Sequence, residues 1–264
     1  MDPNAAYGYP IWWVGLFIAA MGVVLAVLVE LAARWILPVE FRRRHNDVAA
    51  AMLSIIGVTY AVLLAFVAML AWDDFNRAKA ASYAEAGLVH DVANAAAGFA
   101  EPAGSALRSD ITDYARTVIT VEWPAQAEGR RSDSAAGYLD AMDRVAMGFR
   151  PSTPSEGTLQ AQLLRALMRL QDARQERMAA VDSTLPVIVW VVLLSGGGLT
   201  IAFASFLGAP SLAMHLAMAS VLAVSGALVL TLIVALSNPF RGDFRVSAEP
   251  FERVLVQIAA PRVP

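Results

Sequence analysis

The hydrophobic positions of the chain are concentrated in three long stretches that contain no Asp, Glu, Lys or Arg, at residues 3–29, 48–72 and 183–240. A transmembrane helix needs about 20 consecutive apolar residues to cross roughly 30 Å of hydrocarbon, so the third stretch is long enough for two. Gly208-Ala209-Pro210-Ser211 is a turn signal within that stretch. The pattern therefore predicts four transmembrane helices, at about residues 11–37, 49–72, 184–207 and 212–236.

Most of the charge lies between the second and third predicted spans, in residues 73–182. This segment is rich in Ala, and its apolar residues recur at helical spacing, which predicts helices. Nothing after Trp72 breaks the second helix, so we expect it to continue to about residue 99. A helix that ends at Pro124, another over residues 133–149 and a fourth capped by Thr153 and Glu156 should follow. Pro186 should kink or restart the chain before the third span.

These expectations combine into an all-α membrane protein with four transmembrane helices and a helical extra-membrane extension between spans two and three. The predicted parts are a transmembrane hairpin (1–72), the extra-membrane domain (73–182), a second hairpin (183–237) and a C-terminal tail (238–264). Hydrophobic residues make up 58% of the chain and charged residues 16%, which agrees with this class rather than with a soluble enzyme.

Residue composition excludes several kinds of chemistry. The chain has no Cys, and its three histidines do not have metal-ligand spacing. A formal net charge of −3 argues against nucleic-acid binding. We interpret the many carboxylates of residues 73–182 as solubilising helix surfaces, and we expect no catalytic residues, no metal and no cofactor.

Ionisable and glycine-rich positions inside the spans are candidates for function. Glu30 and Arg34 form a favourable pair four residues apart, which is either a structural ion pair or part of an ion path. We interpret His215 as an interfacial histidine, with a proton relay as the alternative. The run Ser195-Gly196-Gly197-Gly198 indicates close helix packing, a local bend or a gating hinge.

The second span carries a stripe of small residues at helical spacing: Ser54, Gly57, Ala61, Ala65 and Ala68. Small residues allow close packing of helices in lipid. The alternative is that the stripe forms the wall of a pore around a symmetry axis, where apolar side chains gate by dewetting. The pattern alone does not separate the two.

Several motifs together resemble the bacterial bestrophin-like family, over roughly residues 45–255. They are GVTYAVLLAF at 57–66 with Trp72 and Phe75, Ala84-Glu85-Ala86, Val121-Glu122-Trp123-Pro124, Asp172-Ala173-Arg174, and the tail residues Asn238, Pro239, Phe240, Arg241, Gly242 and Asp243 with Val246, Ser247, Glu249, Pro250 and Phe251.

The resemblance implies a distant relation to bestrophins, pentameric anion channels with four spans and a pore lined by the second. In animal bestrophins an acidic run after the tail motif helps to hold calcium, but here Phe244 and Arg245 follow Asp243. The aromatic neck of those channels is also not matched, since Ser54, Val58 and Ala61 occupy comparable turns. The missing acidic run argues against a calcium site at Asp243 and leaves that question open, and the unmatched neck argues against the channel that the resemblance implies.

The expected function is a homo-oligomeric ion channel, conducting anions such as chloride, with a pore lined by Ser54, Gly57, Val58, Ala61, Ala65 and Ala68. The alternative is a non-conducting sensor or scaffold that acts through a partner protein. Expected partners are the lipid bilayer, further copies of the chain (five by resemblance) and inorganic anions.

The expected location is a bacterial inner membrane, because Lys79 is the only lysine beside 19 arginines, a bias of GC-rich bacterial genomes. The side of the membrane on which the extension lies is left open. Arg42, Arg43 and Arg44 in the first loop and the arginines of the tail give opposite orientations under the positive-inside rule.

Overall fold

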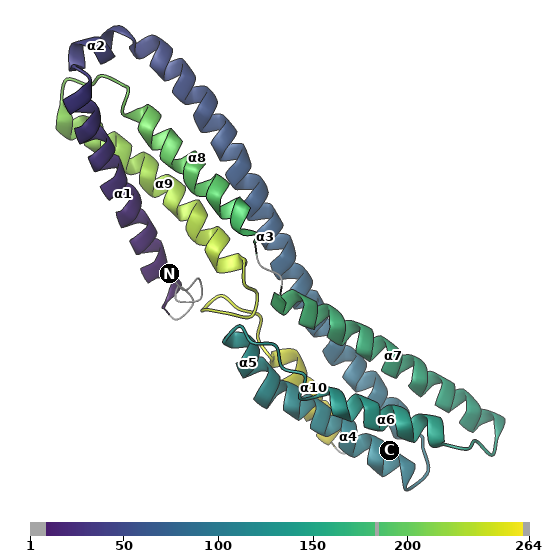
Figure 1. Ribbon diagram of the computed structural model, residues 1–264. Coiled ribbons are helices and arrows are strands. Elements are labelled where there is room, and N and C mark those ends of the chain that lie inside the picture. Colours follow the sequence, from purple (N-terminus) through teal and green to yellow (C-terminus); the bar gives the residue numbers. More distant parts are fainter. Residues whose placement is uncertain (1–8, 183–184, 261–264) are drawn as a thin grey trace. The chain divides into compact units, whose positions relative to one another are not determined.

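The computed structural model describes residues 9–182 and 185–260, and within these ranges the regular structure is entirely helical. The chain divides into two compact units. We call them the membrane unit (residues 1–73, 184–237 and 242–244) and the extension unit (residues 74–183, 238–241 and 245–264). Figure 1 labels their helices.

The membrane unit contains α1 (Ile11–Ile36), the short α2 (Val39–Arg44), the first part of α3 (Asn46–Ala96), α8 (Val187–Ala204) and α9 (Leu212–Leu236). Four of these helices, all except α2, are long and apolar enough to cross a membrane, so the predicted four spans are confirmed. The third is shorter than expected, because it begins after Pro186, whose missing N–H suits a helix start, and ends at Ala204.

Small residues bring α1 and α9 together along their length, where the two helices lie side by side (Figure 1). A Cβ on Gly15 would lie 3.1 Å from Thr231 Cγ2, and one on Gly22 would lie 3.4 Å from the Ala223 side chain. Lipid offers no hydrophobic drive for helix association, so this close contact supplies the dispersion energy that holds the pair.

The helix α3 runs without a break through 51 residues, as the absence of a helix breaker after Trp72 predicts. Its first part belongs to the membrane unit and the rest to the extension unit. Buried residues along it include Leu64, Val67, Ala71, Phe75 and Ala78, which are three or four positions apart and so define one face of the helix.

The extension unit contains the rest of α3, α4 (Ala103–Thr117), a π-helical turn (Val118–Glu122), α5 (Trp123–Ala127), α6 (Ala136–Gly148), α7 (Pro154–Asp182) and α10 (Glu249–Ala259). Two sequence predictions are corrected here. Pro124 does not end a helix, because a π-helical turn directly precedes α5 and carries the helical backbone on past this residue. The next helix begins at Ala136 rather than at residue 133.

The predicted cap of α7 is present. Thr153 Oγ1 accepts a hydrogen bond from the N–H of Glu156 at 3.2 Å, while the Glu156 carboxylate accepts one from the N–H of Ser152 at 2.6 Å. In an ideal capping box the second bond would come from the N–H of Thr153, so the reciprocal bond here is displaced by one residue. Residues 183 and 184, between α7 and α8, lie outside the described part of the chain.

Candidate functional site

The small-residue face of the second span points away from the core of its own subunit. Ser54, Val58, Ala61 and Ala65 are exposed, and a Cβ added to Gly57 would meet no atom within 4 Å. On the neighbouring face of α3, Leu64 and Val67 are buried against Leu193 of α8 and Ile233 of α9. The face of α3 that was predicted from sequence as a possible pore wall can therefore contact molecules outside this chain.

Ala68 differs from the rest of the stripe. It is partly buried and packs against the cluster formed by Leu64, Val67, Leu193 and Ile233. At about 100° per residue, Ala68 lies roughly 20° around the helix from Ala61, on the side of Leu64, and so at the edge of the buried face. Within one chain, Ala68 therefore contributes to packing, and Ser54, Val58, Ala61 and Ala65 form the exposed part of the stripe.

The glycine run of α8 receives a side chain from α3. A Cβ on Gly196 would lie 2.8 Å from Tyr60 Cδ2, and a Cβ on Gly197 would lie 2.8 Å from the Tyr60 hydroxyl oxygen. The two glycines thus form a shallow surface on which the half-buried Tyr60 ring rests. This geometry supports the close-packing interpretation of Ser195-Gly196-Gly197-Gly198.

Glu30 is the centre of a buried charge cluster in the membrane unit. It accepts a hydrogen bond from Arg34 Nε at 2.8 Å and one from Arg42 Nη1 at 3.1 Å, and His215 Nε2 lies 3.1 Å from its Oε2 atom. Glu30 is fully buried, and Arg42 and His215 are each 2% exposed. Arg42 also donates to the carbonyl of Ser205 at 2.6 Å.

This cluster connects parts of the chain that are far apart in sequence. Arg42 joins α1 and α2 to the α8–α9 connection, and His215 adds the first turn of α9. Asn46 strengthens the same connection through two hydrogen bonds with the backbone of Gly208, at 2.7 and 3.2 Å. A buried charge is tolerated where it is paired in this way.

The local pair of Glu30 and Arg34 has the geometry that its four-residue spacing predicts. His215 lies in the first turn of α9, and its side chain is buried against Glu30 rather than exposed. Its interpretation as an interfacial histidine stays a prediction. Sequence reasoning also missed the role of Arg42, which it counted only as a free charge of the first loop. A turn between two helices separates Arg42 from Glu30 along the chain. Helical periodicity therefore could not predict their contact.

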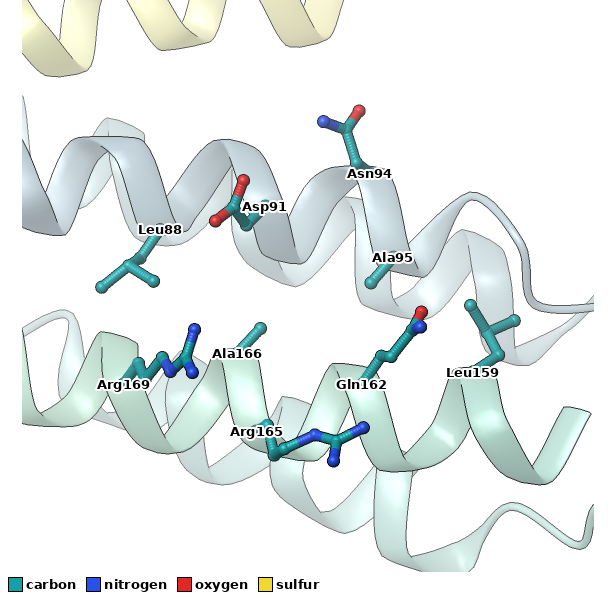
Figure 2. A pocket seen from close by; sticks show the side chains of 9 residues that line it. All are labelled: Leu88, Asp91, Asn94, Ala95, Leu159, Gln162, Arg165, Ala166 and Arg169. Carbon is teal, nitrogen blue, oxygen red and sulfur yellow. The ribbon is translucent and has the colours of Figure 1, made fainter.

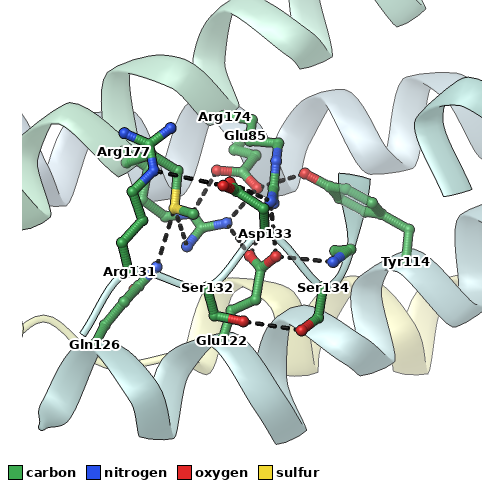
Figure 3. A network of polar contacts seen from close by, with 12 residues as sticks. Glu85, Tyr114, Glu122, Gln126, Arg131, Ser132, Asp133, Ser134, Arg174 and Arg177 are labelled. Carbon is green, nitrogen blue, oxygen red and sulfur yellow. Dashed lines mark hydrogen bonds and ion pairs between the residues drawn. The ribbon is translucent and has the colours of Figure 1, made fainter. Parts of the chain in front are cut away.

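A second buried network occupies the extension unit (Figure 3). Arg177 donates to both oxygens of Glu85, at 2.6 and 3.0 Å, and to Glu122 at 2.9 Å. Arg174 donates to both oxygens of Glu122, at 2.7 and 2.8 Å. The Tyr114 hydroxyl completes the network with a 2.6 Å hydrogen bond to Glu85.

The environment fixes the protonation of this network. Burial raises the pKa of Tyr114 well above its usual value, and the negative charge of Glu85 adds to the rise. For Glu122, burial acts to raise the pKa, but hydrogen bonds and positive charge from Arg174 and Arg177 outweigh it and lower the pKa. Glu122 is therefore ionised at neutral pH, and Tyr114 keeps its proton.

The network corrects one expectation from sequence. The carboxylates of residues 73–182 were all interpreted as solubilising surface, yet Glu85 and Glu122 are fully buried. Each belongs to a motif of the family resemblance, as does Arg174. Motifs that are separate in sequence thus meet in one core.

The tail motif joins the same core. Trp123 contacts the rings of Phe240 and Phe251, each at a centroid distance of 5.6 Å, and donates a hydrogen bond to the carbonyl of Val246 at 3.2 Å. The guanidinium of Arg177 lies 5.3 Å from the Trp123 ring. The described geometry therefore gives Phe240 and its neighbours a packing role.

The remaining tail residues make a tight turn. The carbonyl of Asn238 accepts a bond from the N–H of Arg241 at 3.1 Å, and that of Pro239 accepts one from Val246 at 2.7 Å. Gly242 has φ of +75°, a left-handed conformation that favours glycine. Asp243 Oδ2 accepts a bond from the N–H of Ile11 at 3.1 Å. Among the described residues no group of three or more His, Cys, Asp or Glu side chains is arranged to hold a metal ion.

Comparison with known proteins places this arrangement in a family. The sequence matches the Bestrophin-like domain over residues 20–251. No curated protein matches the sequence.

Solved structures share the fold. A bacterial bestrophin homologue from Klebsiella pneumoniae is 13% identical, covers 94% of this chain and 99% of its own, and superposes with a TM-score of 0.62. A single-residue variant of the Klebsiella pneumoniae homologue is 12% identical, covers 93% of this chain and 99% of its own, and gives a TM-score of 0.69. The match over most of the chain and the shared all-helical fold show that this multi-pass membrane protein belongs to the bestrophin-like family.

Proposed function

We propose that the chain is the subunit of a homo-oligomeric ion channel that conducts anions, with the small-residue face of α3 lining the pore. The observation that carries the proposal is the exposure of Ser54, Val58, Ala61 and Ala65 on one face of a membrane-spanning helix. Membership of the bestrophin-like family supports a channel, and by the same resemblance the assembly would be a pentamer.

Apart from Val58, which lies at their border, residue size separates two exposed faces of α3. Ile55, Val62 and Phe66 are also exposed, and they lie on the adjoining face, about 100° around the helix from the small residues. Large apolar side chains suit contact with lipid or with a neighbouring subunit. Small ones leave room around an axis, so a ring of subunits with the small faces inward would enclose a passage.

Ion movement through such a passage would be passive. No charged residue occurs from Val48 to Trp72, and the Ser54 hydroxyl donates to the carbonyl of Ala50 at 2.8 Å. The wall would therefore be largely apolar. A narrow apolar pore gates by losing its water, without a covalent step or a cofactor. We place the channel in a bacterial inner membrane.

Flux through liposomes tests the proposal. Liposomes that contain the purified protein should release chloride faster than empty ones. Ala61→Trp should reduce the flux by about tenfold or more, because an indole ring at each subunit would fill the passage. Val62→Trp is the matched control, at the same depth on the adjoining face of α3, and should keep most of the flux if the assembly is intact by size-exclusion chromatography.

Flux no greater than that of empty liposomes, across pH and with calcium, would contradict the channel proposal. Equal flux in the Ala61→Trp variant and the parent protein would remove α3 from the pore. A monomer or dimer that purifies with a stoichiometric second protein would instead favour the non-conducting sensor or scaffold.

A further inference from the structure

A groove in the extension unit lies between α3 and α7 (Figure 2). Its volume is about 440 Å³, within the range of small-molecule sites. Leu88 and Ala95 of α3 and Leu159 and Ala166 of α7 provide apolar surface, and all four are partly buried. Leu159 approaches Gly98 closely, since a Cβ added to Gly98 would lie 2.8 Å from Leu159 Cδ2.

Two arginines of α7 line this groove and have no partner in the described part of the chain. Arg165 and Arg169 are exposed, one helical turn apart, and neither makes a hydrogen bond or ion pair with the described residues. The other two arginines of α7, Arg174 and Arg177, are each bonded to carboxylates. The same helix thus uses one pair of guanidinium groups for its core and leaves the other pair at a cavity.

The polar lining of the groove is predominantly basic. Asp91 of α3 is its only carboxylate and forms no ion pair within 4.0 Å among the described residues. Gln162 extends from α7 toward α3 beside the apolar surface (Figure 2). Two guanidinium groups against one carboxylate leave a net charge of one positive unit, with several N–H donors free to bind a ligand.

We infer that this groove binds a small organic oxyanion, a phosphate monoester or carboxylate with a short apolar body. Guanidinium groups bind such anions through paired, charge-assisted hydrogen bonds. The surface of Leu88, Ala95, Leu159 and Ala166 would cover the apolar body, and Asp91 would accept a bond from any hydroxyl it carries. The site is independent of the proposed pore.

Ligand binding can be measured without ion flux. Phenyl phosphate is a suitable probe because it carries both a phosphate and an apolar ring. Inorganic phosphate is the comparator that lacks the ring, and phenol is the comparator that lacks the phosphate. Saturation-transfer NMR on the full-length protein in lipid nanodiscs should show phenyl phosphate binding about tenfold or more tighter than either comparator, because each comparator lacks one of the two contributions.

Variants locate the site. The double change Arg165→Gln and Arg169→Gln should weaken phenyl phosphate by about tenfold or more. Ala166→Phe should weaken it similarly by filling the groove while the charges stay. Arg144→Gln is the matched control, since Arg144 is an exposed arginine of α6 outside the groove, and it should bind as the parent protein does.

Each other result overturns the inference. Absent binding would contradict the inference outright, and unchanged binding in the double variant would show that Arg165 and Arg169 do not hold the probe. Equal loss in Arg144→Gln would show that the arginines attract anions only as general surface charge. Unchanged binding in Ala166→Phe would place the probe outside the groove, and equal binding of inorganic phosphate would exclude the apolar contribution. Loss of binding when anionic lipid replaces zwitterionic lipid would identify a lipid headgroup, rather than a soluble molecule, as the occupant.

Discussion

Arg177 shows how a single residue organises the extension unit. Its fully buried guanidinium bridges Glu85 of α3 and Glu122 of the π-helical turn, and it also contacts the Trp123 ring. Removing a buried charge from water is costly, so the arrangement is stable only when every member is paired. The position of α7 therefore depends on the pairing of its arginines with Glu85 and Glu122 as well as on the burial of apolar side chains.

Loss of that guanidinium should be strongly destabilising. Arg177→Leu would leave Glu85 with only the Tyr114 hydroxyl and would weaken the neutralisation of Glu122, which should lower the free energy of unfolding by about 3–5 kcal/mol. The control is Arg116→Leu, which removes an exposed pair with Asp113 and should have little effect. Thermal unfolding of the purified protein measures both, and similar melting temperatures for the two variants would contradict the role assigned to Arg177.

Sequence predicts residue roles where partners are close along the chain. The pair of Glu30 and Arg34 and the cap formed by Thr153 follow from local spacing, and both are present. The contacts of Glu30 with Arg42 and His215 depend on how separate helices pack, and no periodicity encodes them. The burial of Glu85 and Glu122 was missed for the same reason. In the sequence, a buried carboxylate that pairs with an arginine of another helix cannot be distinguished from an exposed one.

At the scale of elements, the long apolar helices were predictable and the irregular turn was not. Length and hydropathy set the four spans within a few residues, and the missing helix breaker predicted the continuity of α3. The π-helical turn at Val118–Glu122 carries α4 on into α5 past Pro124. It turns Glu122 into the core, a consequence of tertiary pairing that local propensity does not report.

Packing of α8 on α3 can be tested within the glycine run. Gly196→Ala should destabilise the protein by about 1–3 kcal/mol, because its new Cβ would overlap the Tyr60 ring. Gly198→Ala is the matched control, since a Cβ there meets no atom within 4 Å, and it should leave stability unchanged or raise it. Melting temperatures in one detergent give the comparison, and equal effects of the two changes would argue against the Tyr60 contact.

At the scale of the whole molecule, the family and the fold class could be recognised from sequence, whereas the pore could not. Separate motifs such as those around Glu85, Trp123 and Phe240 supported the resemblance, and within the extension unit these residues form one core. A pore belongs to several subunits together, so neither the stripe of small residues nor one folded chain contains it. Within the single chain, the exposed face of α3 is the feature that an assembly would use.

Accessibility to water of the α3 faces tests the central claim most directly. The parent chain contains no cysteine, so single-cysteine variants can be labelled without background. In the protein reconstituted in liposomes, Ala61→Cys and Ala65→Cys should react with a charged, membrane-impermeant thiol reagent about tenfold or more faster than Phe66→Cys, because thiolate forms poorly in an apolar environment. Labelling at Ala61→Cys should also block chloride flux. Equally slow labelling at all three positions, in liposomes that conduct chloride, would show that this face of α3 does not line a water-filled passage.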